Sequence, residues 1–366
     1  MAPEYYIGLM SGTSVDGVDA VVAEFAGRAR SVSAAHERLP AALRAELNAL
    51  QSAGENELHR AALAANALMD CCARAALAAL ERAGVAAGQV AAIGVHGQTV
   101  RHRPDLGYTL QLANAARLAE ATGITVVADF RSRDVAAGGQ GAPLAPGMHS
   151  ALFAVPDRHR AVVNLGGIAN VTDLPRHGDV RGFDTGPGNT LLDAWCERHT
   201  GAPFDRDGAW AATGRVVPAL LAALERDGYF ATPPPKSTGR DRFNLAWLER
   251  HLAALDRPAQ AADVQRTLLA LTARTVAGAI AVHCAGATEV LLCGGGAHSA
   301  LLRSALELAL APRRVTTTGE FGVPVNEVEA LAFAWLAREA LAGRPASLPG
   351  VTGARGARIL GAIYRA

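Results

Sequence analysis

Two carboxylates stand out as residues that could move a proton during catalysis. Asp184 lies in the segment Phe-Asp-Thr-Gly-Pro-Gly-Asn, a polar and glycine-rich stretch that follows an apolar residue. A carboxylate next to an acceptor oxygen can take its proton, as a kinase acting on a hydroxyl group requires. The alternative for Asp184 is a turn-forming aspartate bonded to its own backbone. Glu329 lies at the start of a predicted helix, where the helix dipole alone would favour an acidic residue.

Glycine-containing turns occur at three places where a nucleotide could approach the backbone. Two of them interrupt apolar runs, at residues 6–22 and 162–172, and each pattern is typical of a β-hairpin. The third turn follows the strand-like run 289–293. Turns built of small residues let backbone N–H groups reach a phosphate group. Two matched hairpins half a chain apart therefore predict two related lobes that close on one nucleotide.

Other common nucleotide and hydrolase motifs are absent from the sequence. No GxxxxGK[ST] segment occurs, and no GxGxxG follows the first strand-like run, which disfavours P-loop and Rossmann proteins. The GxSxG motif of many hydrolases is also missing. The histidines show no metal-ligand spacing, and the five cysteines form no CxxC pair. We therefore expect the cysteines to be buried thiols of a reduced cytoplasm.

Polar side chains follow two predicted strands of the N-terminal half, at residues 90–95 and 124–128. These polar residues are His96, Gln98, Thr99, Asp129 and Arg131. In α/β sheets the residues just past the strand ends line the ligand crevice. We therefore expect these side chains at the mouth of one cleft.

Length and composition indicate two domains that each bury a core. The chain has 366 residues, of which 50% are hydrophobic. Its formal net charge of +1 argues against nucleic acid or an acidic membrane as a partner. An apolar run starts at residue 6 with no basic signal segment before it. The uncharged stretch 135–156 contains prolines and glycines, so we expect a loop there and no membrane span.

Strand-like runs alternate with helical patterns along the chain. The predicted strands and hairpins cover residues 6–25, 90–95, 109–112, 124–128, 162–172 and 289–293. The predicted helices cover residues 41–82, 114–122, 191–199, 217–226, 263–285, 299–310 and 326–342. This alternation predicts an α/β sheet with crossover connections.

Lys236 is the only lysine in a chain that otherwise uses arginine. It lies in the Pro-rich stretch that begins at residue 233, which we interpret as a connector or lid. The sequence leaves open whether Lys236 is functional or an incidental surface residue.

Taken in order along nearly the whole chain, these motifs resemble the anhydro-N-acetylmuramic acid kinases, a family of the sugar kinase/Hsp70/actin superfamily. The matching segments are residues 8–19, 94–100, 127–131, 138–144, 164–170, 183–189, 235–240, 293–297, 328–334 and 351–354. The resemblance implies a two-lobed, actin-like α/β ATPase fold (ribonuclease H-like) with a cleft between the lobes. We expect the N-terminal lobe to cover residues 1–159 and the C-terminal lobe residues 160–366.

The same resemblance implies the reaction. An enzyme of this family would take 1,6-anhydro-N-acetylmuramic acid, ATP and water, open the 1,6-anhydro bridge and phosphorylate O6. The products would be N-acetylmuramate 6-phosphate and ADP, in the recycling of bacterial cell wall. Because O6 is locked in the bridge and carries no proton, a carboxylate base would activate water to attack C1. By resemblance Asp184 takes that role, and Glu329 assists near the anomeric centre.

The resemblance also implies which residues bind ATP and sugar. The expected ATP-binding residues are Gly12, Thr13, Ser14, Val15, Asp16, Gly17, Val18, Asp19, Gly166, Gly167, Gly294, Gly295 and Gly296. The expected sugar-binding residues are Gln98, Asp129, Arg131 and Gln140. Mg²⁺ is expected with ATP. Asp16 or Asp19 could hold its water shell or could brace the turn, and spacing does not decide between the two.

Two other functions fit parts of this pattern. One is an ordinary kinase for an amino sugar or a carboxylate, with the same fold and ATP site. The other is a non-enzymatic actin-like filament protein or regulator, although no DNA-binding helix-turn-helix precedes residue 6. From the family we also expect a cytoplasmic homodimer with no nucleic-acid or membrane partner.

Overall fold

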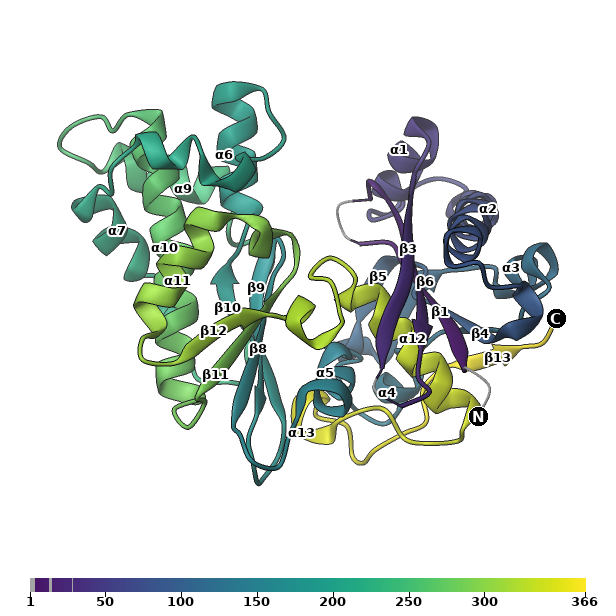
Figure 1. The fold of residues 1–366 in the computed structure, drawn as a ribbon. Helices are drawn as coiled ribbons and strands as arrows, with labels where there is room; N and C mark the ends of the chain where they lie inside the picture. Colours follow the sequence, from purple (N-terminus) through teal and green to yellow (C-terminus); the bar gives the residue numbers. More distant parts are fainter. Residues whose placement is uncertain (1–3, 13–14, 28) are drawn as a thin grey trace. The chain divides into compact units, whose positions relative to one another are not determined.

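The computed structural model describes residues 4–12, 15–27 and 29–366, which form two compact units (Figure 1). The first unit consists of Met1–Leu152 together with Glu327–Ala366, and the second of Phe153–Asn326. Each unit contains a β-sheet with helices packed on it, so the predicted α/β class is confirmed.

The first unit is built on a six-stranded mixed sheet with the strand order β13-β7-β4-β1-β2-β3. Its strands are β1 (Tyr5–Met10), β2 (Gly17–Glu24), β3 (Arg30–Arg38), β4 (Val90–Val95), β7 (Val126–Ala128) and β13 (Ala362–Tyr364), with a separate hairpin of β5 (Gln98–Arg103) and β6 (Tyr108–Leu112). Its helices are α1 (Ala41–Ala49), α2 (Glu57–Ala83), α3 (Ala115–Thr122), α4 (Ser132–Ala136), α5 (Ala145–Phe153), α12 (Val328–Leu341) and α13 (Pro349–Thr352).

Helix α12, from the C-terminal part of the chain, packs closely on this sheet. Two glycines lie beneath it, one in β1 and one in β4. A Cβ atom on Gly8 would lie 1.7 Å from the carbonyl oxygen of Ala330, and a Cβ atom on Gly94 would lie 2.0 Å from that of Phe333. Any side chain at these positions would push the helix away, so glycine permits the contact.

The unit boundaries differ from the lobes expected from the sequence, residues 1–159 and 160–366. Besides α12, the last strand β13 pairs antiparallel with β7 of the first sheet. The segment 327–366 therefore belongs to the first unit and carries Glu329 with it. Sequence periodicity identifies α12 as a helix, but it does not reveal the sheet on which the helix packs.

Helix α2 supplies much of the core of the first unit. Gly84, in the left-handed conformation, ends it. Its buried residues Leu68, Met69 and Cys72 belong to the same core cluster as Ile7 of β1. The helix is long and apolar enough to pass a length-and-composition test for a membrane span, but 61% of its apolar window is buried inside the unit. Its apolar character is therefore explained by core packing.

The second unit repeats the sheet plan of the first. Its strands are β8 (Arg160–Leu165), β9 (Ile168–Leu174), β10 (Arg181–Pro187), β11 (Glu289–Cys293) and β12 (Arg314–Thr317), in the order β10-β9-β8-β11-β12. The pairs β8/β9 and β9/β10 are antiparallel, and β8/β11 and β11/β12 are parallel. The first unit has the same senses along β3-β2-β1-β4-β7. Both predicted hairpins are thus confirmed, and the two units share one sheet topology.

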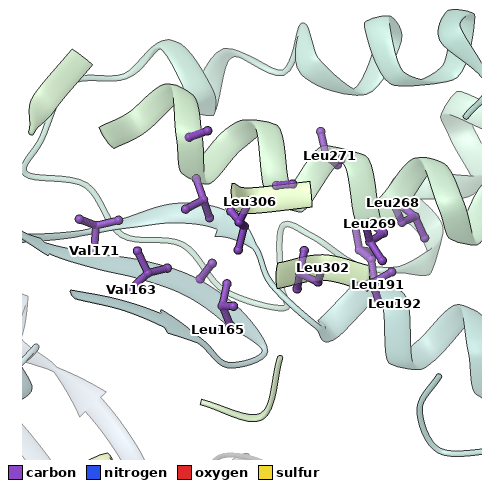
Figure 2. Packing of buried hydrophobic residues seen from close by; sticks show 14 of the residues in the cluster. Val163, Leu165, Val171, Leu191, Leu192, Leu268, Leu269, Leu271, Leu302 and Leu306 are labelled. Carbon is purple, nitrogen blue, oxygen red and sulfur yellow. The ribbon is translucent and has the colours of Figure 1, made fainter. Parts of the chain in front are cut away.

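Helices α10 and α11 pack on the second sheet (Figure 2). The helices of this unit are α6 (Thr190–Thr200), α7 (Pro218–Glu225), α8 (Gly228–Ala231), α9 (Leu245–Ala253), α10 (Ala261–His283) and α11 (Ala300–Leu310). Val163 and Val171 of the sheet share one buried cluster with Leu268 of α10 and with Leu302 and Leu306 of α11. Full burial of each such side chain contributes about 2 kcal/mol, which explains the apolar face of both helices.

Three expectations about local structure are wrong in part. The stretch 135–156 is not only loop, because it contains the end of α4 and helix α5. Asp184, for which a turn-forming role was the alternative, lies in strand β10. Gln98 and Thr99 start strand β5, where a loop beyond β4 was expected. In each case strand or helix formation depends on pairing or packing partners far along the chain.

Candidate functional site

In the second unit, the predicted phosphate turn lies between β8 and β9 and is held by the start of α6. The carbonyl oxygen of Gly166 accepts a hydrogen bond from the N–H of Asn189 at 2.8 Å. The carbonyl oxygen of Gly167 accepts from the N–H groups of Gly188 at 2.9 Å and Thr190 at 3.0 Å. The segment after Asp184 thus fixes the turn that carries the two glycines.

The third predicted glycine element, Gly294 to Gly296, lies against the same turn. Gly294 follows β11 and donates its N–H to the carbonyl oxygen of Val325 at 2.8 Å. A Cβ atom on Gly296 would lie 2.8 Å from both the Oδ1 atom of Asn189 and the Cβ atom of Leu165. The side chain of Asn189 in turn donates to the carbonyl oxygen of Leu165 at 2.9 Å. The structure therefore brings together three segments that were selected separately from the sequence.

Asp184 lies on β10 at a β-bulge. Asp184 pairs with Asn170, and Gly186 pairs with Ala169, so Thr185 is the extra residue of the bulge. Bulges of this kind re-aim side chains and are frequent beside active sites. Gly186 has φ 144°, and a Cβ atom there would lie 2.7 Å from the ring of Phe230. Glycine is thus needed for the bulge to form against this ring.

A loop holds Asp184 by both its backbone and its carboxylate. The N–H of Asp184 donates to the carbonyl oxygen of Lys236 at 3.1 Å. Its carbonyl oxygen accepts from the hydroxyl group of Tyr229 at 2.9 Å, and its Oδ2 atom accepts from the N–H of Thr238 at 3.0 Å. Burial raises the pKa of Asp184 to about 6, while the Thr238 hydrogen bond and the charge of Lys236 oppose the rise. Asp184 is thus a half-buried carboxylate that titrates near neutral pH.

Two charged residues near the phosphate turn were not selected as site residues from the sequence. Asp193, in the first turn of α6, has its pKa raised to about 6 by burial, with Arg240 opposing the rise and Glu197 supporting it. The guanidinium Nη2 atom of Arg240 lies 3.6 Å from the position that a Cβ atom would take on Gly167. Arg240 is the last residue of the segment 235–240, which carries part of the family resemblance. This position could have identified Arg240 as a site residue from the sequence. Asp193 had no such signal.

In the first unit, the end of β1 is bonded to residues predicted to bind sugar. The hydroxyl group of Ser11 donates to the Oε1 atom of Gln98 at 2.7 Å, and both side chains are buried. The N–H of His96 donates to the carbonyl oxygen of Leu9 at 3.0 Å. The first glycine turn follows Ser11 directly, so predicted phosphate and sugar residues are neighbours within this unit.

Arg131 forms a fixed network with His96. Its Nε and Nη2 atoms lie 3.2 and 3.0 Å from the Nε2 atom of His96, and its Nη1 atom donates to the carbonyl oxygen of Gly141 at 2.8 Å. Because arginine can only donate, His96 accepts through Nε2 and is neutral. Burial lowers the pKa of His96 to about 3, and the charge of Arg131 lowers it further. Burial lowers the pKa of Arg131 to about 10, and Glu329 opposes this shift.

The remaining predicted sugar residues are exposed in the same unit. Asp129 has φ 57°, a conformation that costs free energy for residues other than glycine and is typical of functional sites. Gln140 donates its N–H to the carbonyl oxygen of Thr352 at 2.7 Å. The hydroxyl group of Thr352 donates to Asp134, which also accepts the N–H of Gly141. These bonds join the segments 138–144 and 351–354, both of which carried the resemblance.

The first predicted phosphate turn is described in part. Thr13 and Ser14 lie outside the described residues. Val15 has φ 53° and donates its N–H to the carbonyl oxygen of Gly12 at 3.2 Å. The Oδ1 atom of Asp19 lies 2.7 Å from the Nδ1 atom of His36, whereas Asp16 is exposed at the end of the turn. Gly17 and Val18 are buried at the start of β2.

A preformed metal cage is not found in the part of the chain that the structure describes. Over residues 4–12, 15–27 and 29–366, no group of three or more His, Cys, Asp and Glu side chains could hold a metal ion. Mg²⁺ in phosphoryl-transfer sites keeps several waters and takes one or two carboxylates together with substrate phosphates. The exposed carboxylate of Asp16 fits that lesser requirement.

Comparisons with known proteins agree with one another. A family model described as anhydro-N-acetylmuramic acid kinase matches residues 4–366. The anhydro-N-acetylmuramic acid kinase of Bordetella parapertussis is 60% identical over 364 residues, covering 99% of this chain and 96% of the relative. The enzyme of the same name from Cupriavidus pinatubonensis is 56% identical, covering 98% of each chain.

One solved structure is similar in fold. Component A of the (R)-2-hydroxyglutaryl-CoA dehydratase of Acidaminococcus fermentans matches with a TM-score of 0.50 at 13% identity, covering 90% of this chain and 96% of that chain. This likeness shows the fold alone. It supports the predicted α/β fold class.

Proposed function

The chain belongs to the anhydro-N-acetylmuramic acid kinase family, and we propose on this basis that it converts 1,6-anhydro-N-acetylmuramic acid, ATP and water into N-acetylmuramate 6-phosphate and ADP. The reaction would serve cell-wall recycling. The bond between C1 and O6 breaks, a water oxygen bonds to C1, and O6 bonds to the γ-phosphorus as ADP leaves. One proton of the water must go to a base.

Asp184 is the base in this proposal. Its half-buried carboxylate has a pKa of about 6, so it is mostly ionised at neutral pH yet basic enough to accept a proton from water. The Thr238 N–H fixes one carboxylate oxygen, which leaves the other to orient the water. This carboxylate, on a bulge bonded to the Gly166–Gly167 turn through the start of α6, is the observation that supports the proposal most strongly.

Backbone groups of three turns, together with Mg²⁺, would bind the nucleotide. In the first unit we propose the turn from Gly12 to Asp19 for the phosphates. In the second unit we propose Gly166 and Gly167 for the phosphates and Gly294 to Gly296 for the nucleoside, because small residues let backbone reach the ligand. When bound, Mg²⁺ would neutralise phosphate charge, and Asp16 would hold its water shell.

Sugar recognition would come from polar side chains of the first unit. Gln98, Asp129, Arg131 and Gln140 offer amide, carboxylate and guanidinium groups, which suit the hydroxyl, N-acetyl and lactyl groups of the substrate. Glu329 shares an electrostatic interaction with Arg131, and we propose that it contacts the sugar near its anomeric centre. The neutral His96 keeps Arg131 in place without a second positive charge.

Mass spectrometry of the product tests the function. The protein is incubated with ATP, Mg²⁺ and 1,6-anhydro-N-acetylmuramic acid, and the proposal predicts a sugar that gains the mass of phosphate plus water. A gain of phosphate alone would indicate an ordinary sugar kinase of the same fold. ATP-dependent sedimentation without any product would indicate a filament protein. We also propose a cytoplasmic homodimer, which light scattering after size-exclusion chromatography would test.

A further inference from the structure

We propose that Lys236, the single lysine of the chain, is a positioning residue that anchors the loop of residues 235–240 and thereby aims the carboxylate of Asp184 and keeps it ionised. The inference rests on the proposed role of Asp184 as the base. Lys236 itself would touch neither the sugar nor the nucleotide.

The ammonium group of Lys236 is bound inside its own unit. Its Nζ atom donates to the carbonyl oxygens of Tyr229 and Phe230 at 3.2 and 3.3 Å. It also lies 4.7 Å from the centre of the Tyr229 ring. An ammonium group has three donor hydrogens, and two carbonyl oxygens with one aromatic face account for all three. The contacts therefore suit the charged form of lysine.

This anchor is connected to Asp184 along two short routes. The carbonyl oxygen of Lys236 accepts the N–H of Asp184, and two residues further on the N–H of Thr238 binds the carboxylate. On the other side, the hydroxyl group of Tyr229 donates to the carbonyl oxygen of Asp184. Tyr229 and the loop thus both bind Asp184, and the side chain of Lys236 connects the loop to Tyr229. Loss of the ammonium group would free the loop and turn the Thr238 N–H away.

Lys236 also acts on Asp184 through its charge. Burial raises the pKa of Asp184 first, and the Thr238 hydrogen bond and the Lys236 charge lower it. The pKa of Lys236 is lowered by burial, and Asp184 opposes that shift. Other ionisable groups nearby are Tyr229, whose pKa Asp184 helps to raise, Arg242 over the Tyr229 ring, and His283, whose pKa Lys236 helps to lower.

A cavity beside Lys236 explains why its half-buried ammonium group can stay charged. Lys236 lines a cavity of about 680 Å³ within the second unit. The other ionisable residues that line it are Glu225, Arg274 and His283. Water can reach the lysine from this cavity and keep its ammonium group partly hydrated.

The test compares Lys236→Met and Lys236→Arg with the wild-type enzyme over a range of pH. Without the cation the ionised form of Asp184 loses a favourable interaction, so its pKa rises. The acid limb of kcat/KM in Lys236→Met should therefore move to higher pH by about one unit, with rates about tenfold lower below the limb. Lys236→Arg keeps a cation and should restore most of the limb position. KM for ATP should change little in either variant.

Arg242→Met is the matched control, because the guanidinium group of Arg242 also lies over the Tyr229 ring but binds the carboxylate of Asp227. The bond from its backbone N–H to the carbonyl oxygen of Gly239 is kept in the variant. It should leave the acid limb in place. A Lys236→Met enzyme whose rate falls equally at every pH would overturn the proposal and leave lysine a purely structural role, and wild-type behaviour would overturn it too. If Asp184→Asn retains turnover, the proposed function of Asp184 fails first, whatever the lysine variants do.

Discussion

The two units use one sheet topology for different tasks. In the first unit β4 is followed by His96 and Gln98, whereas in the second unit the equivalent strand β11 is followed by Gly294 and two more glycines. In the first unit Arg131 is held in place, because it is bonded to His96 and to the carbonyl oxygen of Gly141. After β11 the second unit has three glycines, so only backbone groups are present there.

The ionisation of the two regions differs as well. His96 is neutral because burial lowers its pKa to about 3, so it does not titrate at physiological pH. Asp184 titrates near pH 6 because burial raises its pKa while one N–H and one cation hold the carboxylate. A preorganised network suits recognition, and a group that titrates near neutrality suits proton transfer. The difference supports the proposal that the first unit recognises the sugar and the second unit transfers the proton.

Removing the base should have the largest effect. Asp184→Asn keeps the size of the side chain but cannot accept the proton, so kcat should fall by about three or more decades while ATP and sugar still bind. Single-turnover kinetics and calorimetric titration measure the two quantities. Asp193→Asn is the control, because Asp193 has a similarly raised pKa, and it should retain most activity. The opposite pattern would transfer the role to Asp193.

Adding a side-chain atom where α12 contacts the sheet should strongly destabilise the first unit. Gly94→Ala places a Cβ atom 2.0 Å from the carbonyl oxygen of Phe333 and should lower the free energy of unfolding by about 3 kcal/mol. Gly278→Ala, in α10, meets no atom within 4 Å and should raise it by about 1 kcal/mol. Urea denaturation measures both variants. An unaffected Gly94→Ala protein would mean that α12 does not pack on β4 as described.

Replacing Arg131 should weaken sugar binding more than it slows the chemical step. Arg131→Lys loses the planar donor group that spans His96 and Gly141, and lysine cannot replace both contacts. The KM for the sugar should rise by about 10- to 100-fold, while kcat and the KM for ATP change little. A fall in kcat with unchanged KM would contradict the division between the two units.

The wild-type enzyme should lose activity in acid with a midpoint near the pKa of Asp184, about 6. The sign follows from the role, because a protonated carboxyl group cannot accept a proton, so kcat/KM should fall about tenfold per pH unit below the midpoint. The profile should be insensitive to His96, which stays neutral in this range. Asp193→Asn should keep the same midpoint, and its loss in that variant would assign the limb to Asp193.

Much of the fold follows from local sequence patterns. The hairpins around Gly12 and Gly166, the strand before Gly294 and most helices have short-range signals in apolar periodicity and turn residues. The return of α12 and β13 to the first unit has none, because it depends on Gly8 and Gly94 meeting a helix more than two hundred residues away. Glycine in a strand signals a close approach, but it does not identify the partner.

The residue types of the candidate site could be predicted from the sequence. The backbone features that position those residues were less predictable. Asp184 and Arg131 could be selected from segments with recognisable patterns. The bulge that aims Asp184 and the loop bond from Thr238 depend on pairing between β9 and β10 and on the course of a Pro-rich stretch. Asp193 is one of many aspartates in first helical turns, and only its burial distinguishes it. Burial is a property of the whole fold, so a pKa near 6 has no sequence signature.

In the proposed mechanism Asp184 activates a water for attack at C1 while O6 takes the phosphoryl group. The most direct measurement is a single turnover with ATP, Mg²⁺ and 1,6-anhydro-N-acetylmuramic acid in ¹⁸O-labelled water, followed by mass spectrometry of the sugar and phosphate fragments. We expect one ¹⁸O label at C1 of N-acetylmuramate 6-phosphate and none in its phosphate group. The Asp184→Asn enzyme should form neither N-acetylmuramate 6-phosphate nor ADP. Release of ADP with an unlabelled sugar, or labelled inorganic phosphate, would contradict it.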